Sequence, residues 1–152
     1  EIQTSLVGSE MCIRDRGYLQ DITQSLEYIN NKSYKHVNNN HSKLKLTQIR
    51  ELVEVNSSIS NLFNEVNELY KNKSFSKIQS IIKQKNDIYN LVQDKILAQV
   101  ARTRNEENSP KNTTLYFSIL QETKDLLNAV MNLLSDYNES HDSSIKPAKL
   151  DK

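Results

Sequence analysis

The stretch TQIRELVEVNSSISNLFNEVNELYKN, residues 47–72, decides the fold class of this chain. Its large apolar side chains return every three or four residues, at Ile49, Leu52, Val55, Ile59, Leu62, Phe63, Val66, Leu69 and Tyr70. This spacing matches the period of an α-helix and gathers the apolar side chains on one face, opposite a polar face. Because a long helix with a single apolar stripe is not stable alone, the stretch predicts packing against other helices.

Three further segments show the same period, at about residues 17–37, 75–104 and 111–138. The first of them carries the stripe Leu19, Ile22, Leu26, Ile29 and Val37. From residue 18 to the end the chain contains no glycine, which disfavours the tight turns of a β-rich domain. We therefore expect an all-α fold, an antiparallel up-down bundle of about four long helices, with a coiled-coil oligomer as the alternative.

Short polar connections separate these segments and contain residues that commonly start helices. Residues 38–46 form a polar loop, and the connection at residues 72–74 is so short that the helices on either side are expected to be antiparallel neighbours. The residues expected to precede the second, third and fourth helices are Thr47, Ser74 and Ser109, the last followed by Pro110 as the first helical residue.

The start of the chain is expected to lie outside the fold. Residues 6–15, LVGSEMCIRD, back-translate into CTC GTG GGC TCG GAG ATG TGT ATA AGA GAC, and Ser5 and Arg16 fit the partial codons on either side. This string resembles a transposase-type sequencing adapter read in one frame. We therefore divide the chain into an adapter-derived segment at residues 1–16, a helical bundle domain at 17–138 and a disordered tail at 139–152.

Charge and composition exclude several classes of protein. The chain has 20 basic and 19 acidic residues, a formal net charge of +1, and its basic residues are scattered, so no nucleic-acid footprint is present. No apolar run approaches the roughly 18–20 residues that span a bilayer. Cys12, the only cysteine, lies in the adapter-derived segment, so the expected domain has no thiol chemistry.

The three histidines do not have the spacing of a metal site. His36 and His41 are five residues apart with no acidic residue between them, whereas paired ligands on one helix are three or four apart. His36 is instead expected to interact with the C-terminal dipole of the first helix. We find no Gly-rich phosphate loop and no nucleophile motif, so no enzyme is expected, with no catalytic and no cofactor-binding residues.

Acidic and aromatic side chains offer the remaining candidates. Acidic pairs three residues apart occur at Glu51 and Glu54, Glu65 and Glu68, and Glu122 and Asp125. Each pair shares a helix face, where it either holds a hard cation or forms the solvated side of the helix. Five tyrosines are expected to pack at the edge of the core with their hydroxyls reaching water: Tyr28, Tyr70, Tyr89, Tyr116 and Tyr137.

Three stretches carry a family resemblance: YLQDITQSLEYINNKSYKHVNNNHSKL (18–44), LFNEVNELYKNKSF (62–75) and TLYFSILQETKDLLNAVMNLL (114–134). In order and spacing they resemble the C-terminal cytoplasmic region of bacterial sodium/phosphate (Na/Pi) cotransporter family proteins. That region is a helical domain related to PhoU, the phosphate-uptake regulator. The resemblance covers nearly all of residues 17–140.

The resemblance implies a regulatory or accessory domain of a sodium-dependent phosphate transporter. Its partner would be the transmembrane transporter domain, encoded upstream in the same chain, and further copies of the chain are a second expected partner. The fragment itself is expected to be soluble and to lie on the cytoplasmic face of the bacterial inner membrane. The alternatives are a free-standing PhoU-like regulator and a generic helical-bundle interaction module.

One departure from the family concerns metal binding. PhoU proteins bind metal clusters through acidic residues in the pattern E/D-x-x-x-D, and residues 17–152 contain no acidic pair four residues apart. The best alignment places Gln121 at the leading position and Asp125 at the closing one, both off the apolar stripe. The metal cluster is therefore not carried over, and the only metal candidates are Asp21, Glu122 and Asp125.

Overall fold

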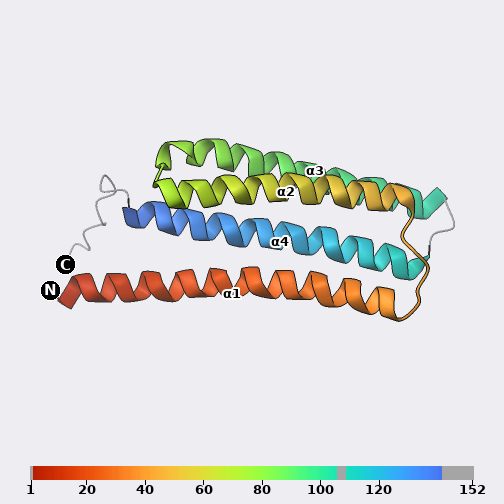
Figure 1. Cartoon of the computed structure of the whole chain (residues 1–152), viewed down its shortest axis with the longest axis horizontal. Helices are drawn as coiled ribbons and strands as arrows, with labels where there is room; N and C mark the ends of the chain where they lie inside the picture. The colour runs from red at the N-terminus through yellow and green to blue at the C-terminus, as the bar shows by residue number, and fades with distance from the viewer. Residues whose placement is uncertain (1, 106–108, 142–152) are drawn as a thin grey trace.

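The computed structural model describes residues 2–105 and 109–141, with side chains in all but residues 2–12, 75, 105, 140 and 141. These residues form helices α1 (Ile2–Asn38), α2 (Leu46–Asn72), α3 (Ile78–Asn105) and α4 (Pro110–His141), and a short 3₁₀ helix, η1 (Phe75–Lys77), before α3. The described part contains no strand. The predicted all-α bundle of about four long helices is confirmed (Figure 1).

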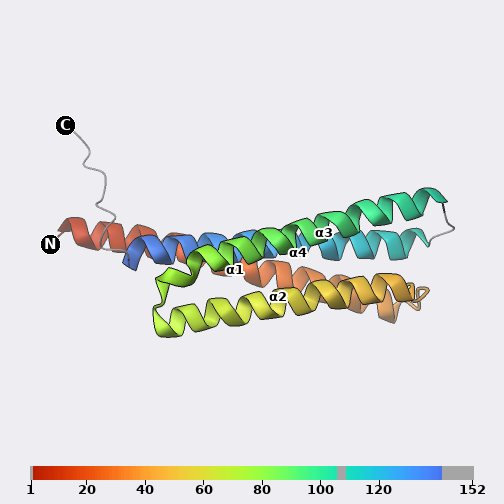
Figure 2. The same cartoon turned by 90° about the horizontal axis from the view of Figure 1, so that it is seen from above.

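The helices run up and down along one long axis, and each follows its neighbour in the opposite direction (Figure 1). The closest pairs are α1 with α4, α2 with α3, and α3 with α4. By contrast, α1 and α2 are hardly in contact with each other. Figure 2 shows the same bundle from above, with α3 crossing over α4 and with α2 in the lower half of the picture. The fourth helix therefore links α1 to the other helices.

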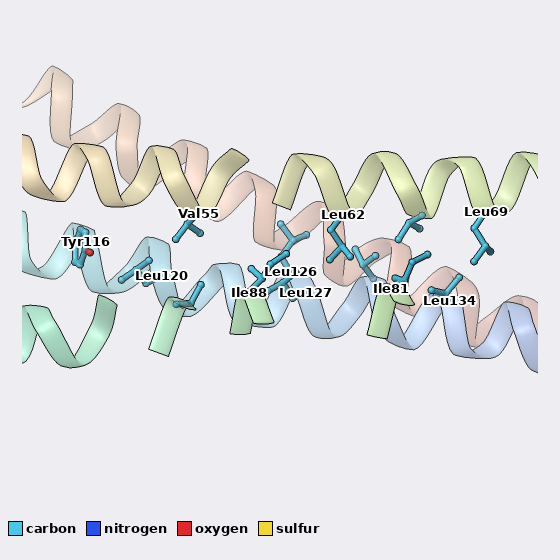
Figure 3. Packing of buried hydrophobic residues seen from close by; sticks show 13 residues of the cluster. Val55, Leu62, Leu69, Ile81, Ile88, Tyr116, Leu120, Leu126, Leu127 and Leu134 are labelled. Atoms are coloured by element: carbon cyan, nitrogen blue, oxygen red, sulfur yellow. The ribbon is translucent and has the colours of Figure 1, made fainter. Parts of the chain in front are cut away.

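The apolar core lies between α2, α3 and α4 (Figure 3). Each of these helices contributes side chains of the predicted stripes, among them Leu62, Val92 and Leu127, which are fully buried. Burying such a side chain stabilises the fold by roughly 1.5–3 kcal/mol. Most members of the predicted stripes therefore lie on the faces that meet, but Ile49 and Ile82 are exposed, and Ile81 is buried in place of Ile82.

The stripe of α1 differs from the prediction. Leu19, Leu26 and Val37 are 53%, 51% and 72% exposed, and none of the apolar side chains described in α1, from residue 13 onward, belongs to the buried core. Because α1 packs mainly on α4, only a narrow strip of its surface is covered, and the buried side chain on that strip is Ser25. The wider apolar face of α1 remains open.

The helix ends agree with the predictions in one place and differ in two. Pro110 is the first residue of α4, and the Thr113 amide donates to the Ser109 carbonyl at 3.0 Å, as expected. Thr47 is not the N-cap of α2. That position is Lys45, whose backbone amide donates to the Gln48 side chain at 3.0 Å, so Thr47 lies in the first turn. After Ser74, η1 precedes α3, so the α-helix begins at residue 78 rather than 75.

The two ends of the bundle extend beyond the predicted bounds. The first helix was predicted from residue 17 but begins at Ile2, because residues 2–16 contain no proline or polar loop to interrupt it. Arg14 comes within 3.9 Å of Asp136 on α4. The division of the chain at residue 17 stays a prediction. At the other end, α4 continues to His141, and the remainder of the predicted tail lies outside the described residues.

Hydropathy adds one more observation. Among the described helices, none combines the length and the apolar character that crossing a membrane requires.

Candidate functional site

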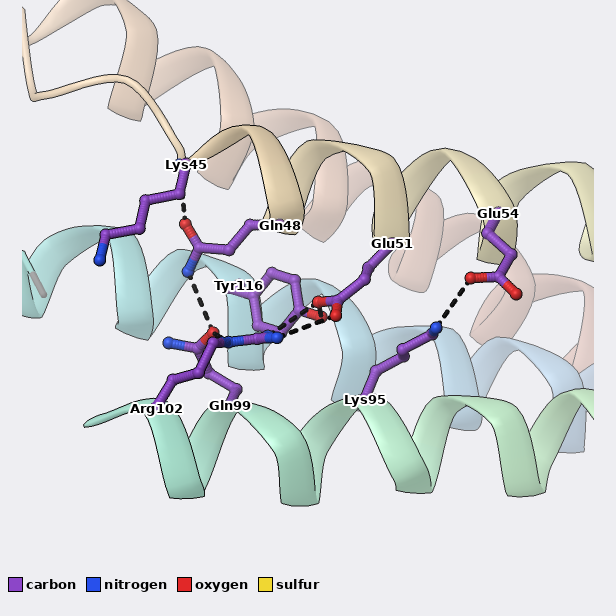
Figure 4. A network of polar contacts seen from close by, with 8 residues as sticks. All are labelled: Lys45, Gln48, Glu51, Glu54, Lys95, Gln99, Arg102 and Tyr116. Carbon is purple, nitrogen blue, oxygen red and sulfur yellow. Dashed lines mark hydrogen bonds and ion pairs between the residues drawn. The ribbon is translucent and has the colours of Figure 1, made fainter. Parts of the chain in front are cut away.

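A network of polar side chains joins α2, α3 and α4 near the α1–α2 loop (Figure 4). At its centre, Arg102 donates from Nη1 to Glu51 Oε1 at 2.9 Å and from Nη2 to Glu51 Oε2 at 2.8 Å. The Tyr116 hydroxyl donates to the same Oε2 atom. Each partner comes from a different helix, so the three side chains fix how α2, α3 and α4 sit against one another.

Two glutamines extend this network. Arg102 Nε donates to Gln99 Oε1 at 2.9 Å, and Gln48 Nε2 approaches the same oxygen at 3.3 Å. Gln48 and Glu51 are three residues apart on α2, as Gln99 and Arg102 are on α3, so each pair shares one helix face. Both glutamines are buried, at 2% and 0% exposure. Both side-chain oxygens and Gln48 Nε2 are hydrogen-bonded, whereas Gln99 Nε2 is buried without a partner among the described residues.

The electrostatics of the network favour the charged pair. Partial burial would raise the pKa of Glu51, but hydrogen bonds from Arg102 and Tyr116 and the nearby charges of Arg102 and Lys95 lower it overall. Burial and the Glu51 carboxylate raise the pKa of the Tyr116 hydroxyl, which therefore stays protonated and donates. With both carboxylate oxygens of Glu51 occupied by donors, this arrangement is a structural clamp and offers no free base.

The tyrosine prediction is wrong for two residues. Tyr116 is fully buried, and its hydroxyl meets Glu51 rather than water. The Tyr70 hydroxyl is also buried, and desolvation, with smaller effects of Asp15 and Tyr137, raises its pKa to about 12. Tyr28 is exposed, in agreement with the prediction. Sequence spacing places a tyrosine on the apolar stripe but does not show how many helices will cover it.

Neither of the two acidic pairs on α2 forms a cation site. Glu51 is held by Arg102 and Tyr116, and Glu54 lies 2.8 Å from Lys95 on α3. Glu65 accepts a hydrogen bond from Gln84 at 2.7 Å, and Glu68 pairs with Lys71 at 3.3 Å. Each carboxylate therefore has a nitrogen donor from the protein itself.

The three metal candidates lie around one hollow. Asp21 of α1 and Glu122 and Asp125 of α4 all line a cavity of about 290 Å³ between these helices. Sequence spacing alone did not bring Asp21 next to the other two. No group of three histidine, cysteine or acidic side chains in the described part is arranged so that it could hold a metal ion. Gln121 and Asp125 are exposed, as predicted.

His36 and His41 meet at the end of α1, with their ring centroids 5.1 Å apart. His36 Nε2 donates to the Ser42 carbonyl at 3.2 Å, which ties the end of the helix to the loop. Desolvation, followed by the positive charges of Lys111 and His36, lowers the pKa of His41. The position of Lys111 beside these histidines was not visible in the sequence, because 70 or more residues separate them along the chain.

An apolar groove runs between α1 and α2, with α4 as its floor. Near the loop it holds a cavity of about 600 Å³ lined by apolar residues that include Val37, Ile49 and Leu115. Further along, a second cavity of about 410 Å³ is lined by Leu26 and Phe63 among others. Both cavities share Leu52 and Ile119, so they form one continuous depression, which we call the α1–α2 groove.

Comparisons of the chain with protein families, with curated proteins and with solved structures find no match. The geometry described above and the sequence resemblance are therefore the basis for the functional proposal.

Proposed function

We propose that this chain is a non-catalytic helical accessory domain of a sodium-dependent phosphate transporter of the Na/Pi cotransporter family. In the intact protein the transmembrane part would precede the bundle, which would lie on the cytoplasmic face of the membrane. The proposal is supported by the resemblance of residues 18–44, 62–75 and 114–134. The first and last of these stretches correspond to most of α1 with its loop and to most of α4, the two helices that pack along each other.

The observation that carries the proposal is the asymmetry of the bundle. Helices α2, α3 and α4 enclose the core and are fixed together by the Glu51–Arg102–Tyr116 clamp. The opposite face, where α1 and α2 flank the groove, leaves large apolar side chains in water, including Leu26, Val37 and Ile49. Contiguous exposed apolar surface marks an interaction site in most proteins. A rigid body with one open apolar face is suited to dock onto a neighbouring domain.

Such a domain would regulate the transporter by packing against it and would catalyse no reaction. A transporter alternates between conformations, and a rigid body that packs better against one of them shifts the equilibrium towards it. The clamp supports this role because it keeps the relative positions of α2, α3 and α4 fixed while the exposed face makes the contact.

The first test is the genomic locus. A long sequencing read across the Gly17 junction is expected to reveal several apolar spans of about twenty residues running into the bundle. The intact protein is then placed in vesicles, and sodium-dependent phosphate uptake is measured for the wild type and for a variant with Leu26, Val37 and Ile49 changed to serine. We expect altered uptake in this variant. The matched control is Leu97→Ser on α3, an equally exposed leucine, which should leave uptake unchanged.

A start codon near Gly17, or a second helical repeat upstream of it, would instead support the free-standing PhoU-like regulator. Uptake that is identical in the serine variant and the wild type would overturn the docking role of the open face.

A further inference from the structure

A cationic hollow lies where the end of α1 and the following loop meet the start of α4. Its lining includes Lys32 and His36 of α1, His41 of the loop and Lys111 of α4, around a volume of about 270 Å³. We call it the end pocket. Among the residues that the structure describes, no carboxylate lines this pocket. Two lysines and two histidines are therefore its described titratable side chains.

Two further features make this space electrically positive. The first turn of α4, which begins at Pro110 beside the pocket, contains no acidic residue, so no carboxylate within that turn offsets the positive end of the helix dipole. Desolvation, followed by the positive charges of Lys111 and His36, lowers the pKa of His41, so Lys111 lies close enough to repel a charged His41 ring. An anion entering the pocket would relieve this repulsion.

The end pocket opens into the α1–α2 groove. His36, His41 and Leu115 line both the pocket and the 600 Å³ cavity of the groove. Beyond them the described lining of the groove is mainly apolar, with the exposed Val37 and Ile49 on its rim, and it includes the charged side chain of Lys43. A positive site thus continues directly into an apolar channel, and the two together match a ligand with an anionic head and an apolar chain.

We propose that this junction binds one lipid molecule with a phosphate headgroup, the phosphate lying among Lys32, His41 and Lys111 and an acyl chain lying in the α1–α2 groove. The charge of the pocket selects the anionic head, and the groove selects the chain. Phosphate is favoured because it accepts several hydrogen bonds and carries up to two negative charges near neutral pH, which suits two lysine cations with a histidine N–H donor between them. This inference does not depend on the transporter assignment, since it rests on the described residues alone.

The test is calorimetric titration of the full chain with three probes. The two probes that carry a dodecyl chain are used below their critical micelle concentrations. Dodecyl phosphate carries head and chain, inorganic phosphate carries the head alone, and an uncharged dodecyl tetraethylene glycol ether carries the chain alone. We expect dodecyl phosphate to bind at least tenfold more tightly than either of the others, because only this probe occupies both parts of the junction.

Variants then locate the site. K32Q/K111Q is expected to weaken dodecyl phosphate binding at least tenfold. The control K77Q/K83Q removes the same charge from exposed lysines of η1 and α3, at the other end of the bundle, and should leave binding unchanged. For the chain, Val37→Asn should weaken binding while Leu97→Asn, at a similarly exposed position outside the groove, should not. All six substitutions are at exposed residues, so unchanged melting temperatures of the four variants verify folding.

Three results would overturn the proposal. Equal binding of the uncharged ether would reduce the junction to an apolar surface with no anion site. Equal binding of inorganic phosphate would leave a site for the free ion, in which the groove plays no part. An equal loss in K77Q/K83Q would mean that binding follows the overall charge of the chain rather than the end pocket.

Discussion

Replacing Glu51 by glutamine tests whether the polar clamp stabilises the bundle. The substitution keeps the shape of the side chain but removes its charge and replaces one acceptor oxygen by an NH₂ group. That group would then face Arg102 Nη1 or Nη2, which are donors at 2.9 and 2.8 Å, or the Tyr116 hydroxyl. At least one donor of the clamp would lose its acceptor.

The expected magnitude follows from the exposure of the pair. Hydrogen bonds to charged groups contribute about 1.5–3 kcal/mol when buried, and exposed ion pairs contribute about 0–1 kcal/mol. The side chains of Arg102 and Glu51 are 20% and 18% exposed, so the pair lies nearer the buried case. We expect Glu51→Gln to reduce the free energy of unfolding by about 2 kcal/mol. At about 2–4 °C per kcal/mol for a chain of this size, the melting temperature should fall by about 4–8 °C.

Glu54→Gln is the matched control. Glu54 lies three residues further along α2 and also pairs with a cation, Lys95 at 2.8 Å, but its side chain is 53% exposed. Its substitution should reduce the free energy of unfolding by less than about 1 kcal/mol. Thermal unfolding, followed by circular dichroism at neutral pH, measures the melting temperatures of the two variants and of the wild type. If the two variants melt within about 1 °C of each other, the clamp does not stabilise the fold as argued.

The difference in stability between the wild type and Glu51→Gln should depend on pH. The folded-state pKa of Glu51 is lowered from its ordinary value of 4.5, so its stabilising effect is complete above that value and is lost as pH falls through the lowered pKa. The difference in stability between the wild type and Glu51→Gln should therefore be constant from pH 7 to about pH 5 and should shrink below pH 4. A difference that grows on acidification would contradict this assignment.

Two further outcomes are expected. Leu62→Ala and Leu126→Ala remove side chains that are 0% and 3% exposed and should each cost about 2–5 kcal/mol in urea unfolding; if neither lowers the midpoint, the assignment of the apolar stripes is wrong. A chain that begins at Gly17 should melt at the same temperature as the full chain, because the Arg14 side chain that meets Asp136 is 57% exposed and such pairs contribute about 0–1 kcal/mol. A loss of several degrees would show that the segment before Gly17 contributes to the fold.

The apolar period of residues 47–72 was sufficient to predict an α-helix and its packing face, because helix geometry fixes which residues share a side. The same reasoning located Pro110 as a helix start. It failed at Thr47, because capping by Gln48 of the Lys45 backbone depends on a side-chain rotamer and not on residue type alone. It also failed for the stripe of α1, since periodicity shows that a face is apolar but not whether another helix covers it.

The candidate sites divide in the same way. Glu51, Arg102 and Tyr116 were each recognised as members of a helix, yet 51 residues separate Glu51 from Arg102 and 65 separate Glu51 from Tyr116. No local pattern signals such a pair. The metal candidates Asp21, Glu122 and Asp125 line one cavity. Sequence spacing could place Glu122 and Asp125 on one helix face, but it could not place Asp21 beside them. The end pocket, built from the first helix, its loop and the fourth helix, was not foreseen.

The sequence by itself determined that the chain forms long amphipathic helices joined by short connections, because hydrophobic periodicity and the lack of glycine are local properties of the chain. The tertiary structure alone decided which helices meet. It placed α1 on α4 and away from α2, so that an apolar groove stays open, and it brought Arg102 onto Glu51 and Lys111 beside His41. These outcomes depend on the free energy of packing between distant segments, and such energies cannot be read from any one stretch of sequence.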